Sequence, residues 1–164
     1  MCDRVYVDEC GCDDRLQREH GWSFCGVPYW DKRVGHATER LSVVAAWQKT
    51  ATATALIAPL SFEGTCHHHL FELWLRVMLC PCLRAGQVVI LDNARFHRQK
   101  NARFHRQKVV QRILKRVKCR ALFLPAYSPD FNLVETQWHS FKTRVCAYRL
   151  KGMNFKHAFE AANL

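Results

Sequence analysis

The chain has 164 residues, of which 49% are hydrophobic and 24% charged. This length and composition predict one globular domain that buries a core without disulfides or structural metal, and they exclude a disordered or fibrous chain. Lysine and arginine number 25 against 14 acidic residues, so we expect a surface that attracts polyanions and binds nucleic acid in a salt-dependent way.

The first ten residues mix acidic and basic side chains, whereas a signal peptide needs an apolar segment of about 7–15 residues. No run approaches the roughly 18 uncharged apolar residues that cross a bilayer. We therefore expect a cytoplasmic protein with no membrane partner. In that reducing compartment the nine cysteines are expected to be free thiols.

In chain order, the first elements favour β structure. Three runs predict an antiparallel meander, at residues 4–8, 22–27 and 41–47. The polar residues 11–19 predict a turn. Residues 66–83 repeat apolar side chains at helical spacing, and Gly86 follows as a stop, which predicts a helix.

The remaining elements alternate. Residues 88–91 are a continuous apolar run of the kind buried on both faces of a parallel sheet, and residues 121–124 are another. Helices are predicted at residues 108–117 and from about Asn132. Three β runs followed by helix, strand, helix, strand and helix predict an α/β domain with a mixed sheet.

Three carboxylates stand in matched positions. Asp8 and Asp92 each end a predicted strand, and Glu135 lies near the start of a predicted helix. One aspartate at a strand end is usually a turn former, but three such carboxylates favour a metal site, since two Mg²⁺ ions about 3.5–4 Å apart can activate a nucleophile and stabilise a leaving group at a phosphodiester. Glu9 would point to the opposite face of its strand, so we leave it outside the site.

The segments around these carboxylates include Val-Ile-Leu-Asp-Asn at 89–93 and Tyr-Ser-Pro-Asp-Phe-Asn at 127–132. Over nearly the whole chain the sequence resembles the mariner-related bacterial insertion-sequence transposases of the DDE superfamily. The resemblance implies a ribonuclease-H-like fold in which Asp8, Asp92 and Glu135 are catalytic and bind two Mg²⁺ or Mn²⁺ ions. It also implies DNA cleavage and strand transfer, and a nucleoid-associated protein.

Two departures from the family leave other functions open. Leu133 stands where the family usually has proline, which predicts a looser helix start. The catalytic domain would occupy residues 1–164, so we expect the amino-terminal helix-turn-helix region to be absent. One alternative is an inactive fragment that binds DNA or associates with full-length transposase, as a homodimer or heteromer, and another is a nuclease on the same fold.

The octapeptide NARFHRQK occurs twice in succession, at residues 93–100 and 101–108. Neither copy is a structural unit, so a duplication in the coding DNA is favoured over a purposeful repeat. It leaves 134 − 92 = 42 residues between Asp92 and Glu135, and 42 − 8 = 34 without one copy, the usual spacing in the superfamily. Eight more helical residues would add roughly 12 Å and rotate the downstream segment by about 80°. We therefore predict a bulge or an overhanging helix end, which keeps the two carboxylates within about 10 Å of each other.

Several basic side chains are candidate phosphate contacts: Arg95, His97, Arg98, Lys142 and Arg144. The first three belong to a basic run beside Asp92 that fits a solvated helix face equally well. The last two lie about two turns beyond Glu135 on its predicted helix.

Other chemistry is less well supported by spacing. The Cys-His-His-His segment at 66–69 and the cysteine pairs at 10/12 and 80/82 do not match structural zinc ligands, so the histidines are expected to form a polar helix start. Cys119 and Cys146 are expected in the core. So are four tryptophans, Trp22, Trp47, Trp74 and Trp138, and the last of these should pack the helix of Glu135 onto the sheet together with Phe141.

Overall fold

The computed structural model describes residues 4–17, 22–28, 30, 35–49, 54–92, 100–125 and 134–162, with the backbone alone at 54, 100–106 and 135. Five strands form one sheet in the order β3-β2-β1-β4-β5. The strands are β1 Arg4–Asp13, β2 Arg40–Lys49, β3 Thr54–Glu63, β4 Val88–Leu91 and β5 Arg120–Phe123. The helices are α1 His68–Trp74, α2 Lys100–Arg116, α3 Val134–Leu150 and α4 Phe155–Ala162, and α1 continues into a π turn Leu75–Leu79 and a 3₁₀ turn Cys80–Cys82.

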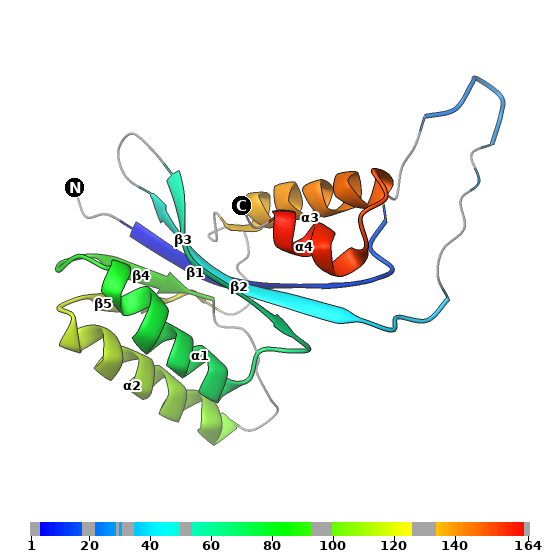
Figure 1. The fold of residues 1–164 in the computed structure, drawn as a ribbon. Coiled ribbons are helices and arrows are strands. Elements are labelled where there is room, and N and C mark those ends of the chain that lie inside the picture. The colour runs from blue at the N-terminus through cyan, green and yellow to red at the C-terminus, as the bar shows by residue number, and fades with distance from the viewer. Residues whose placement is uncertain are drawn as a thin grey trace.

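The sheet is mixed. Strands β1, β2 and β3 pair antiparallel, whereas β4 pairs parallel with both β1 and β5. Helices α1 and α2 lie on one face of this sheet, and α3 and α4 lie on the other (Figure 1). The predicted α/β class is confirmed, with an antiparallel meander followed by alternating helices and strands. Within the described residues, no helix is both long and apolar enough to span a bilayer.

Alternation along the strands divides the buried side chains into two cores. Tyr6 and Ile90 face α3 and α4, where they pack with Phe141 and Phe159. Their neighbours Val5 and Val89 face α1 and α2. Because successive side chains of a strand point to opposite faces, this alternation also fixes which polar residues of β1 and β4 lie beneath α3.

Two predictions near the amino terminus, one of a turn and one of a strand, differ from the structure. Residues 11–19 are not simply a turn, because β1 continues to Asp13. Residues 22–27 are not a strand: Gly26 has φ 81° and the amide of Val27 donates to the carbonyl of Phe24, which makes a turn. Trp22, expected in the core, is fully exposed at 101%. Aromatic and β-branched residues favour strands only where a neighbouring strand or core covers them.

The third strand of the meander is Thr54–Glu63, which the sequence did not predict. Its alanines and Pro59 are poor strand formers, but β3 is an edge strand, where proline is tolerated at a bulge. A bulge is present: Val44 pairs with Leu60 and Ala46 with Ile57, so two residues of β3 oppose one of β2. Ala58 sits there at φ 52° and its carbonyl accepts a hydrogen bond from the buried indole of Trp74 at 2.7 Å.

The second octapeptide copy lies at the amino-terminal end of helix α2. Among the described side chains of α2, those packed on the sheet lie further along the helix: Val109, Val110, Ile113 and Leu114. The carboxyl-terminal end is fixed, because Lys118 adopts φ 57° and the amides of Lys118 and Cys119 donate to the carbonyls of Lys115 and Leu114, a Schellman motif. Extra residues therefore lengthen α2 at its start, in line with the predicted overhanging end. Residues 93–99 of the first copy fall outside the described part of the chain.

Candidate active site

Strands β1 and β4 bring the first two predicted ligands together. Val7 pairs with Leu91 in parallel register, so Asp8 and Asp92 occupy the next position on neighbouring strands, which lie about 4.8 Å apart. Both follow side chains that face α1 and α2, namely Val7 and Leu91. The two aspartates therefore share the face covered by α3.

Helix α3 contacts Asp8 directly. The indole Nε1 of Trp138 donates a hydrogen bond to Oδ2 of Asp8 at 3.0 Å. Trp138 is 4% exposed, and its ring packs edge-on against Trp47 with centroids 4.8 Å apart. Trp138 and Phe141 are both buried in the core beneath α3, which confirms that they pack this helix onto the sheet.

The contacts of α3 with β1 and the segment after it show where the backbone of Glu135 lies. The helix contacts β1 at Asp8 through Trp138, and further on Arg149 donates to the carbonyl of Leu16 at 2.7 Å. Glu135 precedes Trp138 by three residues, which is about 4.5 Å along the axis and nearly the same face of the helix. Its backbone therefore lies one turn from the Asp8 contact. The structure does not describe the Glu135 side chain, so its distance from Asp92 stays a prediction.

Glu9 lies on the opposite face from Asp8, as expected. Its Oε1 accepts a hydrogen bond from the amide of Cys66 at 3.3 Å, and its Oε2 is buried with no partner among the described residues. Burial raises the pKa of the Glu9 carboxyl. Burial and the neighbouring Glu9 also raise the pKa of the Cys66 thiol, to about 12. Glu9 belongs to the α1 side of the sheet and not to the carboxylate pair.

The donor set suits a hard cation. Asp8 and Asp92 offer carboxylate oxygens, the ligands that Mg²⁺ and Mn²⁺ prefer, from adjacent strands of a rigid sheet. No three His, Cys, Asp or Glu side chains form a metal-binding group within the described residues, a set that does not include the side chain of Glu135. The pair therefore has donors that fit a divalent metal, and Glu135 of α3 stays the predicted third ligand.

The predicted phosphate contacts fall in two groups. Arg95, His97 and Arg98 lie outside the described residues. Lys142 is exposed on α3. The pKa of the Cys10 thiol is raised, mainly by its hydrogen bond with Cys12, and the positive charge of Lys142 opposes this rise. Arg144 is also exposed, but its Nε and Nη2 donate to the carbonyl of Ala162 at 3.3 and 2.9 Å. Arg144 thus holds the end of α4, and its role as a phosphate contact stays a prediction.

The other cysteine and histidine predictions hold. His67 caps the start of α1 by accepting a hydrogen bond from the amide of Leu70 at 3.2 Å, as expected for a polar helix start. Cys119 and Cys146 are buried at 5% and 7% exposure. The described cysteines are thiols, with no disulfide among them.

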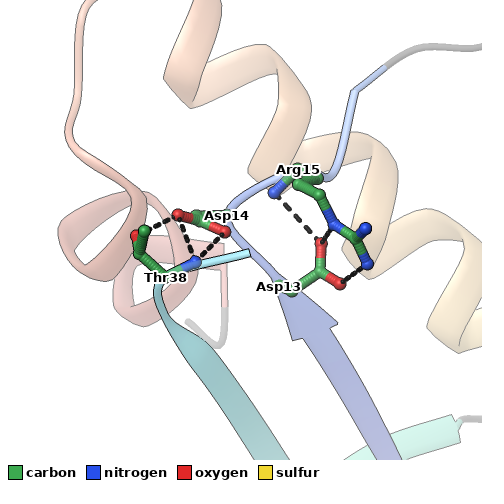
Figure 2. A network of polar contacts seen from close by, with 4 residues as sticks. All are labelled: Asp13, Asp14, Arg15 and Thr38. Carbon is green, nitrogen blue, oxygen red and sulfur yellow. Dashed lines mark hydrogen bonds and ion pairs between the residues drawn. The ribbon is translucent and has the colours of Figure 1, made fainter. Parts of the chain in front are cut away.

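A polar network fixes the far end of β1. Figure 2 shows Asp14 accepting hydrogen bonds from the hydroxyl and amide of Thr38, while Arg15 pairs with Asp13 at 2.7 Å. The hydrogen bonds between Asp14 and Thr38 join the segment that leaves β1 to the segment that enters β2. They hold the ends of the two strands together beyond their last paired residues, Asp13 and Arg40.

Sequence reasoning assigned Trp138 to packing and missed its hydrogen bond. The available signal was its spacing, because a residue three positions after Glu135 lies on the same helix face as that glutamate. A buried tryptophan needs an acceptor for its N–H, and Asp8 was a candidate acceptor on the same predicted face.

Residues 3–152 match the family model described as the DDE superfamily endonuclease. The chain belongs to the DDE superfamily endonucleases. This confirms the family predicted from the sequence, and divalent metal dependence is a property of that family. No curated protein sequence is recognisably similar to the chain.

Solved structures share the fold of this DDE domain. A Mos1 transposase paired-end complex with the left transposon end is 16% identical with a TM-score of 0.55, over 84% of this chain and 41% of that one. A pre-cleavage Mos1 transpososome is 12% identical with a TM-score of 0.54, over 97% and 51%. A simian T-cell lymphotropic virus intasome in complex with the PP2A regulatory subunit B56 gamma is 13% identical with a TM-score of 0.53, over 98% and 46%. The chain spans about half the length of these proteins or less.

Proposed function

We propose that this chain is a transposase catalytic domain that cleaves DNA at the ends of a mobile element and joins the 3′ hydroxyl to target DNA. The observation that supports it is the parallel register of β1 and β4, in which Val7 and Leu91, the residues before Asp8 and Asp92, are paired. Two carboxylates at neighbouring positions would repel each other, and a divalent cation would relieve that repulsion.

The three carboxylates would hold two Mg²⁺ or Mn²⁺ ions, with Asp8 and Asp92 from the sheet and Glu135 from α3. Such ions activate a nucleophile and stabilise the leaving oxygen at a phosphodiester. The protein supplies a rigid frame for the ligands. Lys142, with Arg144 and the basic residues Arg95, His97 and Arg98, would neutralise the DNA backbone, and none of them is expected to read bases.

A nicking assay tests this proposal. Purified protein should nick supercoiled plasmid DNA in the presence of Mn²⁺, and Asp92→Asn should abolish the nick. Glu9→Gln is the matched control, because Glu9 neighbours Asp8 in sequence but lies on the other face of the sheet. Joining of the cleaved 3′ ends to a second DNA distinguishes a transposase from a nuclease of the same fold.

A second candidate function is an inactive fragment that binds DNA or associates with a full-length transposase, in a homodimer or heteromer on the nucleoid. The duplicated octapeptide favours it, because the second copy lengthens α2 at the end that follows Asp92. Salt-sensitive DNA binding with no nick at any Mn²⁺ concentration would support this function and contradict the first.

A further inference from the structure

We propose that Trp138 is a positioning residue, which orients the carboxylate of Asp8 toward a metal and docks the first turns of α3 against β1. The inference rests on the proposed function for its metal and extends it to a residue that binds neither metal nor DNA. Its basis is the 3.0 Å hydrogen bond from Nε1 of Trp138 to Oδ2 of Asp8.

The direction of this N–H is fixed by packing. Trp138 is 4% exposed and contacts two aromatic rings edge-on, Trp47 at 4.8 Å and 78°, and Phe141 at 6.0 Å and 77°. A buried ring packed in this way cannot turn its N–H away from Asp8 without moving its neighbours. The donor is therefore preorganised before any metal binds.

The hydrogen bond selects how Asp8 presents its oxygens. Oδ2 accepts from the indole, and this contact restrains the orientation of the Asp8 carboxylate. Groups that hydrogen-bond to metal ligands fix ligand orientation, and their loss typically lowers metal affinity about 10–100-fold. Trp138 fits this role because its indole N–H donates to Asp8, a predicted metal ligand, and an indole N–H is a donor that does not itself bind a metal.

The same bond links two ligands on different elements. Asp8 stands on β1, and Glu135 precedes Trp138 by about 4.5 Å of helix axis. Val134, the first residue of α3, is fully buried in the same core as Trp138. Weakening the Trp138 contact should therefore loosen the turn that contains Glu135, as well as free the Asp8 carboxylate.

A purely structural role would predict something different. A buried indole needs any acceptor, and Trp74 supplies the comparison: it is 1% exposed and donates to the carbonyl of Ala58 at 2.7 Å. Trp74 lies in the core on the other face of the sheet. Trp74→Phe and Trp138→Phe each remove one indole hydrogen bond, but only the second touches Asp8.

The test combines Mn²⁺ calorimetry with amide hydrogen exchange on the metal-free protein. Trp138→Phe should bind Mn²⁺ about 10–100-fold more weakly and exchange faster at residues 138–141, the first amides of α3 that can bond within the helix, whereas Trp74→Phe should change neither by more than about threefold. Equal effects of the two variants on affinity and exchange would overturn the proposal. Absence of Mn²⁺ binding by the unsubstituted chain would refute the proposed function, while the exchange data would still decide whether Trp138 docks α3.

A spectroscopic measurement keeps the test valid if Trp138→Phe fails to fold. In the unsubstituted protein, the indole N–H resonance of Trp138 should shift when Mg²⁺ is added, because its acceptor becomes a metal ligand, and that of Trp74 should stay in place. A Trp138 resonance that does not move while calorimetry records Mg²⁺ binding would overturn the proposal.

Discussion

Asp8 and Asp92 follow the paired residues Val7 and Leu91 on neighbouring parallel strands. Because neighbouring strands lie about 4.8 Å apart, we expect the two aspartates to bring two negative charges close together. Without a cation, this arrangement costs free energy that an uncharged amide would not.

The first prediction concerns that cost. In metal-free buffer, Asp92→Asn should raise the free energy of unfolding by a few tenths to about 1 kcal/mol, because like charges directly opposite each other in a sheet are destabilising by about this amount. Mg²⁺ should stabilise the unsubstituted protein and not the variant. Urea denaturation with and without Mg²⁺ measures both effects. Glu160→Gln, at an exposed position of α4, is the control that should respond like the unsubstituted chain.

The second prediction concerns the stability and Mn²⁺ affinity of a protein that lacks residues 101–108. The shortened protein should fold with nearly unchanged stability and bind Mn²⁺ with similar affinity, because the end of α2 is fixed by the motif at Lys118 and the described side chains of α2 that pack on the sheet, Val109 to Leu114, are all retained. Calorimetry on the two purified proteins measures the affinity. Mn²⁺ binding by the shortened protein alone would mean that the octapeptide disables the site, which is the expectation for an inactive remnant.

The third prediction tests the end of α2. Lys118 has φ 57°, a conformation that glycine adopts without strain. Lys118→Gly should therefore raise the free energy of unfolding by roughly 0.5–1 kcal/mol. Lys115→Gly, three residues earlier inside the helix, should lower it by about 1 kcal/mol. Urea denaturation compares the two, and a loss of stability in Lys118→Gly would contradict the left-handed helix end.

The fourth prediction concerns pH and the network in Figure 2. Hydrogen bonds from Thr38, chiefly its hydroxyl, hold the pKa of the Asp14 carboxyl below its ordinary value of 3.8. A lowered pKa in the folded state means that the stabilisation is present above pH 3.8 and is lost as pH falls through the lower, folded value. Amide exchange at Thr38 should thus be slower in the unsubstituted protein than in Asp14→Asn at pH 6, and the difference should vanish in strong acid. A difference that persists at low pH would contradict this account.

The sequence predicted the parallel half of the fold better than the antiparallel half. Val88–Leu91 and the β5 run were found because strands buried on both faces are apolar without interruption. Thr54–Glu63 was missed because an edge strand with a bulge has no such signal. Residues 22–27 have strand-like composition, but nothing in the described structure covers Trp22.

The candidate site, like the fold, was predicted only in part from the sequence. The apolar run before Asp92 was enough to place this aspartate directly after a strand, and the motifs around Asp92 and Glu135 were enough to indicate the family, but Asp8 lies inside β1 and not at its end as predicted. Only the folded chain shows that Asp8 and Asp92 follow residues paired in parallel register, and that Trp138 bonds to Asp8, 130 residues away. The physical reason is that strand register and helix docking depend on pairing and packing between distant segments, whereas side-chain periodicity reports only whether a residue faces a core.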